Sequence, residues 1–354
     1  MSTPVPSPRG RGSAANPPNR FEHFSLERDI DWDPDQDPAP RTQFLRDLSQ
    51  SIITYNDSPD IPFNASFNPY RGCEHGCAYC YARPFHEYLG FSAGLDFETK
   101  IVIKENAPEL LRRELSSRKW QPQELAMSGV TDCYQPIERK LQLTRRCLAV
   151  LAEFRNPVSV ITKNFLVTRD LDLLSELAAH QAAMVHLSIN SLDPELARRL
   201  EPRAASPKLR LAAVEALARA GVPVGILVAP VIPSLNDHEM PAVLAAAKAA
   251  GAICAGTEVL RLPFAVAPLF EQWLDRNYPE KKEKVLGRIR AVRGGKMNDP
   301  RFGSRMRGEG IFADQISQMF HVARRKAGLP EDGPDLSIAS FRRPTGPQLD
   351  LGLK

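Results

Sequence analysis

The chain has 354 residues, of which 43% are apolar and 25% charged, with a formal net charge of +4 at neutral pH. This length allows one large domain or two ordinary ones. No apolar run approaches the roughly 20 residues that cross a bilayer. The amino-terminal stretch is polar and rich in Pro, Gly and Arg, unlike a signal peptide. These features indicate a cytoplasmic protein without a membrane segment.

The first 45 residues lack apolar periodicity, and the stretch RDIDWDPDQDPAPR within them is mostly acidic and contains proline. A segment of this composition buries too little apolar surface to fold alone. We therefore predict a disordered or loosely attached leader over residues 1–45, followed by a core domain over residues 46–265.

Five short runs rich in Val, Ile and Leu recur before residue 262, and none of them alternates with polar residues. They lie near Leu125 and begin at Val158, Ala183, Val222 and Ala252. Strands that are buried on both faces of a parallel sheet have this pattern. One more strand just before Cys73 would bring the number to about six.

The segments between these runs carry signals of helices. Asp193 and Ser206 each stand as an N-cap before a proline. A further helix is predicted to begin at Asn236 or Asp237 and to end at Gly251, a residue suited to a left-handed C-cap. Repeated strand–helix units predict an α/β fold with right-handed connections, as a full or partial barrel. A doubly wound open sheet is the alternative, because periodicity alone does not distinguish it from a barrel.

After residue 265 the pattern predicts helices and loops without strands, as a helical extension over residues 266–330 and a tail over residues 331–354. Residues 281–307 hold ten Lys or Arg against Glu283 and Asp299, a local charge of about +8. Such a concentration of charge binds phosphates. This basic segment is therefore a candidate contact for nucleic acid, and a solvated helix packed on the barrel is the structural alternative.

Three of the six cysteines lie within eight positions, as Cys73, Cys77 and Cys80. In a reducing compartment such a cluster more often binds a metal than forms disulfides. A structural zinc site normally has four ligands, and His86 would be needed as the fourth. A [4Fe-4S] cluster normally takes four cysteines, so three cysteines leave one iron free to hold a substrate or cofactor.

The C-x3-C-x2-C spacing, with an aromatic residue before the third cysteine, resembles the signature of the radical S-adenosylmethionine (SAM) superfamily. The wider stretch NPYRGCEHGCAYCYARP resembles its spore photoproduct lyase-like branch, whose members are often labelled DNA repair photolyases. The resemblance implies a partial (β/α)6 barrel with the cluster loop after the first strand, a [4Fe-4S] cluster and SAM. It also implies reductive cleavage of SAM to a 5′-deoxyadenosyl radical that abstracts hydrogen from a substrate, with flavodoxin or ferredoxin as the electron donor.

The same resemblance implies that SAM is contacted at the carboxyl ends of the strands, where barrel active sites form. The matching positions are Tyr79, Thr131, Asp132, Lys163 and Ser188 or Asn190, with Arg203 as a further candidate. Lys163 is expected to pair with the SAM carboxylate and Tyr79 to lie near the adenine. The structural alternatives are a solvated lysine at 163, a helix cap or turn at 131–132, and a structural ion pair for Arg203.

One departure from the branch concerns the hydrogen donor. Photoproduct lyases resemble one another in a Cys-Thr-Ser-Asp stretch whose cysteine returns hydrogen to the product radical, and the matching position here is Gly129. Cys133 or Tyr134 would be substitutes, although a buried structural cysteine is the simpler interpretation of Cys133. The substrate therefore stays open between nucleic acid and a peptide, protein or small molecule. A non-catalytic, zinc-stabilised nucleic-acid-binding module is the alternative from another class.

Overall fold

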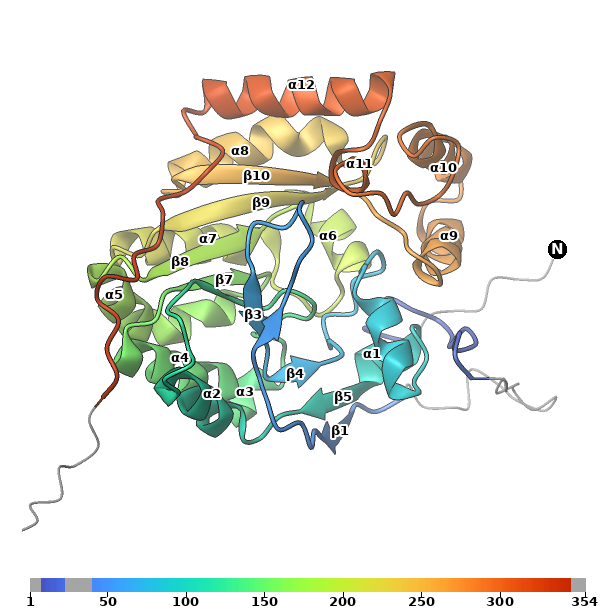
Figure 1. Cartoon of the computed structure of the whole chain (residues 1–354). Coiled ribbons are helices and arrows are strands. Elements are labelled where there is room, and N and C mark those ends of the chain that lie inside the picture. Colours follow the sequence, from blue (N-terminus) through green and yellow to red (C-terminus); the bar gives the residue numbers. More distant parts are fainter. Residues whose placement is uncertain (1–7, 23–39, 345–354) are drawn as a thin grey trace, which may run out of the picture.

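The structure, a computed structural model, describes residues 8–22 and 40–344, and a seven-stranded sheet lies at its centre (Figure 1). The strands of this sheet are β2 (Thr54–Tyr55), β3 (Ala65–Phe67), β6 (Leu125–Met127), β7 (Val158–Thr162), β8 (Ala183–Ser188), β9 (Val224–Val231) and β10 (Cys254–Val259). Their order is β10-β9-β8-β7-β6-β3-β2. Every neighbouring pair from β3 to β10 is parallel, and β2 is antiparallel to β3 at the edge.

The six parallel strands and their helices form an open barrel, which confirms the predicted partial (β/α)6 architecture and the five apolar runs as strands. Figure 1 shows the helices covering the outer side of the curved sheet. These helices are α2 (Ala107–Ser116), α4 (Leu143–Phe154), α5 (Leu171–Ala179), α7 (Pro207–Arg219) and α8 (Met240–Ala249). Short elements occupy the connections: α3 (Glu138–Leu141), η2 (Phe165–Asp170), α6 (Pro194–Leu200) and η3 (Asp237–Glu239).

The predicted caps are present at two helices. The Asp193 carboxylate accepts from the amides of Glu195 and Leu196, and the Ser206 hydroxyl accepts from the amide of Leu209. The third helix begins later than predicted, at Met240, after the 3-10 turn η3. The reason is that the Asn236 side chain is used elsewhere: it accepts from the Ile232 amide at 2.6 Å and donates to the Asn190 carbonyl at 2.8 Å.

The strands separate an apolar outer side from a more polar inner side. Val185, Leu187 and Ile226 are fully buried in the core under the helices. Because side chains alternate along a strand, His186 and Ser188 of β8 face the inside of the barrel. Gly225 of β9 leaves room there, since an added Cβ would stand 2.9 Å from the His186 ring.

A second, small sheet lies beside the barrel, in the order β1 (Gln43–Arg46), β5 (Lys100–Ile103) and β4 (Tyr70–Arg71). The sequence did not predict it, because its strands are two to four residues long. The chain runs from β4 through the cysteine loop to the 3-10 helix η1 (Arg83–Leu89) and α1 (Leu95–Thr99). The small sheet therefore anchors both ends of the segment that contains the cysteines.

Helices follow β10, as α9 (Val266–Asn277), α10 (Lys282–Ala291), α11 (Ser304–Arg307) and α12 (Ile311–Lys326). From residue 266 to residue 344 the described chain contains no strand, as predicted. In Figure 1, α12 lies across α8 and β10 at one edge of the barrel. None of the helices in the described ranges is long and apolar enough to cross a bilayer.

The described part of the predicted tail packs on the barrel at the starts of the strands (Figure 1). Just before the tail, the Pro330 carbonyl accepts from the amide of Ala255 in β10 at 3.1 Å. Further along, the amides of Ser337 and Arg342 donate to the carbonyls of Gln181 and Phe154 at 2.8 and 2.9 Å. This strap lies at the end of the barrel opposite the cysteine loop.

Candidate active site

The cysteine loop follows the first parallel strand and is shaped by two glycines. Gly72 and Gly76 have positive φ angles of 77° and 66°, a region that side chains disfavour. Cys73 and Cys77 are buried and Cys80 is half-buried, and all three thiols are free. The loop is tied to its surroundings through its backbone, since the Cys73 amide donates to Phe97 and the Ala78 amide to Leu200, both at 2.9 Å.

A buried ion pair stands behind the loop. Arg83 donates to the Cys77 carbonyl at 2.9 Å and to the Glu98 carboxylate at 2.6 Å, and both charged groups are fully buried. Gly76 lies against the same carboxylate, because an added Cβ would stand 2.7 Å from Glu98 Oε2. The pair therefore fixes the loop that carries the thiols.

Residues 8–22 close over this arrangement, although they fall within the predicted leader. The amides of Gly12 and Ser13 donate to the Glu98 carboxylate at 3.0 and 2.9 Å. An added Cβ at Gly12 would stand 1.8 Å from the Gly76 carbonyl. The prediction of a loosely attached leader thus does not hold for residues 8–22, which use backbone amides rather than an apolar face. Residues 1–7 and 23–39 of that leader lie outside the described residues.

Burial and nearby cations act in opposite directions on the thiols of the loop. Burial raises the pKa of Cys77, and Lys163 opposes this; burial also raises the pKa of Cys80, and Arg83 opposes this most. In the described ranges no three His, Cys, Asp or Glu side chains are placed to hold one metal ion. In an iron–sulfur cluster, however, each thiolate binds a different iron, so the thiols need not converge on one point. The three cysteine sulfurs, with Lys163 and Arg83 as nearby cations, fit a cluster of this kind.

Asp132, a predicted SAM contact, is engaged by protein groups. Its carboxylate accepts from the Thr162 hydroxyl, the Lys163 amide and the Tyr134 amide at 2.8, 2.8 and 2.9 Å. It also lies 3.3 Å from Nδ1 of His75 in the cysteine loop. Burial disfavours charge on this imidazole, but Asp132 outweighs it and raises the pKa of His75 to about 10. This pair links the loop to the ends of β6 and β7, which favours a positioning role for Asp132.

Thr131 and Arg203 also have protein partners. The Thr131 hydroxyl donates to the Tyr70 carbonyl at 3.0 Å. Arg203 lies 3.1 Å from the carboxylate of Glu74, and its amide donates to the His75 carbonyl at 3.2 Å. These contacts match the structural alternatives, a turn residue and an ion pair, and both stabilise the cysteine loop.

Tyr79, Lys163 and Ser188 gather around a buried carboxylate that the sequence analysis missed. The Tyr79 hydroxyl and the Arg210 guanidinium both donate to Glu201. Arg210 also donates to the Ser188 carbonyl at 2.9 Å. Burial disfavours the charged form of Lys163, yet Cys77 and Glu201 outweigh it and raise the lysine's pKa. Charged residues in helical segments are usually exposed. Nothing in the sequence therefore indicated that Glu201 and Arg210 form a buried pair, apart from their proximity to Arg203.

Asn190 lies at the same network with one polar atom unpaired. Its side-chain amide nitrogen is 3.5 Å from the Tyr79 hydroxyl. Its side-chain oxygen is buried and has no hydrogen-bond partner in the structure. A buried acceptor without a partner is costly. Among the predicted SAM contacts, this oxygen is therefore the atom best suited to accept a hydrogen bond from a bound ligand.

Cys133 and Tyr134, the two substitutes considered for the hydrogen donor, are both fully buried. Cys133 lies in the main apolar core, which favours a structural role, and the Tyr134 hydroxyl donates to Asp170 at 3.0 Å. Tyr81, which directly follows the third cysteine of the loop, reaches the position instead: its hydroxyl donates to the Gly129 carbonyl at 2.6 Å. The Tyr81 ring also lies 4.5 Å from the guanidinium of Arg261.

The basic segment 281–307 is largely used to hold the C-terminal helices. Arg293 is buried and donates to the Val259 and Leu260 carbonyls at 2.7 and 2.6 Å. Lys282, Arg301 and Arg305 pair with carboxylates. Seven cations of the segment make no ion pair with a described residue. Of these, Arg293 is buried, and Lys281 and Arg288 lie over the rings of Tyr278 and Phe312. Four others have no such contact: Lys284, Arg290, Lys296 and Arg307. Only these remain available for a phosphate-bearing partner.

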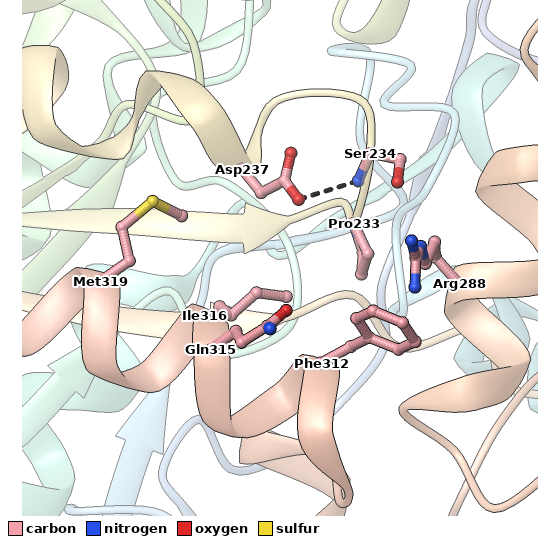
Figure 2. A pocket seen from close by; sticks show the side chains of 8 residues that line it. All are labelled: Pro233, Ser234, Asp237, Arg288, Phe312, Gln315, Ile316 and Met319. Atoms are coloured by element: carbon pink, nitrogen blue, oxygen red, sulfur yellow. Dashed lines mark hydrogen bonds between the residues drawn. The ribbon is translucent and has the colours of Figure 1, made fainter.

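Arg288 of the same segment lines a cavity of about 300 Å³ between α10, α12 and the loop after β9 (Figure 2). Its guanidinium lies 3.5 Å from the centre of the Phe312 ring. On the opposite wall the Asp237 carboxylate accepts from the Ser234 amide at 2.9 Å. Arg288 therefore packs α10 onto α12, on the outer side of the barrel.

Comparisons with known proteins agree with this geometry. The family model of the radical SAM superfamily matches residues 67–247, about half of the chain. The chain belongs to the radical SAM superfamily. Spore photoproduct lyase complexed with dinucleoside spore photoproduct has a similar fold, with a TM-score of 0.59 at 16% identity over 80% of this chain and 79% of that one.

Two proteins of similar sequence are known only as uncharacterized proteins. One from Mycobacterium tuberculosis is 39% identical over 222 residues, 62% of this chain, and the match spans 65% of that relative's length. One from Methanocaldococcus jannaschii is 32% identical over 221 residues, 62% of this chain and 78% of the relative. The names of these relatives indicate neither a family nor a substrate.

Proposed function

We propose that this chain is a radical SAM enzyme that holds a [4Fe-4S] cluster through Cys73, Cys77 and Cys80. The observation that carries the proposal is the position of three free thiols in a glycine-shaped loop after the first strand of a six-stranded parallel barrel. When bound, the cluster supplies the electron that cleaves SAM to methionine and a 5′-deoxyadenosyl radical, which abstracts hydrogen from the substrate. The proposal keeps the cytoplasm as the compartment, since thiolate ligands need reducing surroundings.

Different residues of the chain would bind different parts of SAM. Lys163 offers a half-buried cation near Cys77 for the SAM carboxylate. Asn190 offers an unpaired oxygen and Ser188 a strand-end hydroxyl for the ribose. Tyr79 is held against Glu201 and would border the adenine. Thr131, Asp132 and Arg203 hold the loop in place, so that the other groups can orient the cofactor.

The test is anaerobic reconstitution with iron and sulfide, followed by dithionite reduction with SAM. We expect about four irons per chain and 5′-deoxyadenosine as product, both lost in Cys77→Ala. The matched control is Cys147→Ala, which removes a buried core thiol far from the loop. Zinc without iron in the purified protein would contradict the proposal and favour the zinc-stabilised binding module.

For the substrate, we propose a phosphate-bearing polymer, with a peptide, protein or small molecule as the alternative. The support is the group of cations without a pairing carboxylate in the C-terminal extension and a fold shared with a lyase whose bound ligand is a dinucleoside. Gly129 stands where that branch carries its hydrogen-donating cysteine, and the Tyr81 hydroxyl lies there instead. Tyr81 is therefore our candidate hydrogen donor, and the reaction is expected to differ from repair of the same lesion.

Salt dependence of binding tests this substrate class. If single-stranded oligonucleotides bind the extension, replacing Lys284, Arg290 and Arg307 by Gln should lower the slope of log K against log salt by about 0.7 per lost phosphate contact. The control is Lys248→Gln on α8. An unchanged slope in the triple variant would contradict nucleic acid binding through this extension. Arg293 and Arg305 are unsuitable for neutralisation, because they hold the fold.

A further inference from the structure

The cavity of about 300 Å³ between α10, α12 and the loop after β9 combines an apolar floor with two opposite charges (Figure 2). The floor comes from α12, where Phe312, Ile316 and Met319 stand three or four residues apart and so share one face of the helix. Small-molecule sites have an apolar lining with a few placed polar groups, and volumes from about 300 to 1,000 Å³. The cavity therefore has the composition and the size of a site for a small molecule.

Arg288 supplies the positive charge of the cavity. Its guanidinium lies 3.5 Å from the centre of the Phe312 ring, which covers one face of the group. The N–H groups point outward in the plane of the guanidinium, so the ring leaves them free to donate. Among the described residues, the Arg288 side chain has neither a carboxylate nor another hydrogen-bond acceptor as a partner. A guanidinium fixed in this way is suited to a carboxylate, which it binds through two parallel hydrogen bonds.

Asp237 supplies the negative charge from the opposite wall (Figure 2). Its carboxylate accepts from the amides of Ser234 and His238 at 2.9 and 3.1 Å, and no lysine or arginine in the described ranges pairs with it. The first of these bonds holds Ser234 at a φ of 65°, which is uncommon for a residue other than glycine. An ionised carboxylate has about four acceptor positions, so Asp237 can still accept from a donor in the cavity.

We propose that this cavity binds a free α-amino acid with an apolar side chain. Arg288 would hold its carboxylate and Asp237 its ammonium group, and its side chain would lie on the floor formed by α12. The site is separate from the cysteine loop, and binding there needs no cluster. The inference therefore goes beyond the proposed function and does not depend on it.

The charges favour a zwitterion over a phosphate or a nucleotide. Arg288 and Asp237 are the two charged residues that line the cavity. A phosphate group with a charge of about −1.5 to −2 would be attracted by the first and repelled by the second, whereas a free amino acid satisfies both. A direct ion pair would satisfy them as well, but the two side chains face each other across the cavity without pairing.

The loop after β9 connects this cavity with the proposed SAM site. Pro233 and Ser234 of the loop line the cavity. Asn236, two residues further on, donates to the Asn190 carbonyl at 2.8 Å. A ligand in the cavity would therefore contact the loop that supports Asn190 without contacting SAM, and neither ligand should displace the other.

The test is isothermal titration calorimetry of the reconstituted full chain with L-leucine and with two analogues that each lack one charge. Leucinamide lacks the carboxylate, and N-acetylleucine lacks the ammonium group. We expect each analogue to bind on the order of tenfold more weakly than leucine, because it loses charge-assisted hydrogen bonds. In Arg288→Gln leucine should lose its advantage over leucinamide alone, and in Asp237→Asn its advantage over N-acetylleucine alone.

The matched controls are Arg325→Gln and Asp314→Asn, which make the same chemical changes at exposed positions of α12 outside the cavity. Both should bind leucine as the wild type does. Gln315→Trp is a second variant that does not depend on how well α10 packs without Arg288. Gln315 is exposed and lines the cavity, so an indole there fills the space without removing a charge, and leucine binding should be lost.

Several results would overturn the proposal. These are no binding of leucine or phenylalanine at millimolar concentration, equal affinity for leucine and its two analogues, or wild-type affinity in Gln315→Trp. Displacement of leucine by excess SAM would place the amino acid in the SAM site and would also overturn it. Failure of the proposed function looks different, because a chain that assembles no cluster should still bind leucine with the same preference over both analogues.

Discussion

Gly76 is the residue at which the backbone of the cysteine loop depends most on the absence of a side chain. In Gly76→Ala, the positive φ costs about 1–2 kcal/mol, and the added Cβ would stand 2.7 Å from the Glu98 carboxylate. We expect the variant to fold and to lose most of its iron after reconstitution and desalting, measured as iron and sulfide per chain.

The control for this prediction is Gly328→Ala. Gly328 has nearly the same φ, 64°, but an added Cβ there meets nothing within 4 Å. It carries the backbone cost alone, so its iron content should equal that of the wild type. Equal iron content in both variants would show that the contact with Glu98 does not shape the loop.

Glu98 is the buried carboxylate on which three segments converge. Glu98→Gln leaves Arg83 as a buried charge without its counter-charge, which typically costs about 3–5 kcal/mol. We expect the free energy of unfolding in urea to fall by that amount. Glu153→Gln, which breaks an exposed pair with Arg112, should cost no more than about 1 kcal/mol. Similar losses in the two variants would mean that the Glu98 pair is not desolvated.

Among the larger elements, the segment 8–22 is expected to act as a cover of the cysteine loop. In Gly12→Ala the added Cβ meets the Gly76 carbonyl at 1.8 Å, so the segment must move away. We expect trypsin to cleave after Arg11 on the order of ten times faster, and the reconstituted cluster to bleach faster in air. Gly10→Ala is the control, since Gly10 has open space around it, so that its added Cβ meets nothing even though its φ is positive. Equal cleavage of the two variants would argue against a cover.

The strands and the cysteine loop were predictable because their signals are local. Apolar runs such as Val224–Val231 leave few alternatives to a buried parallel strand. The cover was not predictable, because Gly12 and Ser13 bind through backbone amides and leave no pattern in the sequence. Glu98 and Glu201 were not predictable either. Their charge suggests exposed side chains, whereas in the structure both are buried in ion pairs with arginines.

Over the whole molecule, segments without helices or strands cover the cysteine loop at one end and the starts of the strands at the other. The tail meets the starts of the strands, and Phe341 packs on Phe154 of α4 with ring centres 6.3 Å apart. Because Phe341 is only partly buried, we expect Phe341→Ala to lower the free energy of unfolding by about 1–2 kcal/mol. Ile338→Ala, at an exposed position of the same tail, should change it by no more than about 0.5 kcal/mol.

This tail prediction also separates the two ends of the barrel. The Phe341 contact lies opposite the cysteine loop, and distant sites usually add independently. Phe341→Ala should therefore lower the urea midpoint while iron content and 5′-deoxyadenosine formation stay at wild-type values, unlike Gly76→Ala. A loss of iron in Phe341→Ala would mean that the two ends are coupled through the strands, and the tail would then have to be counted as part of the site.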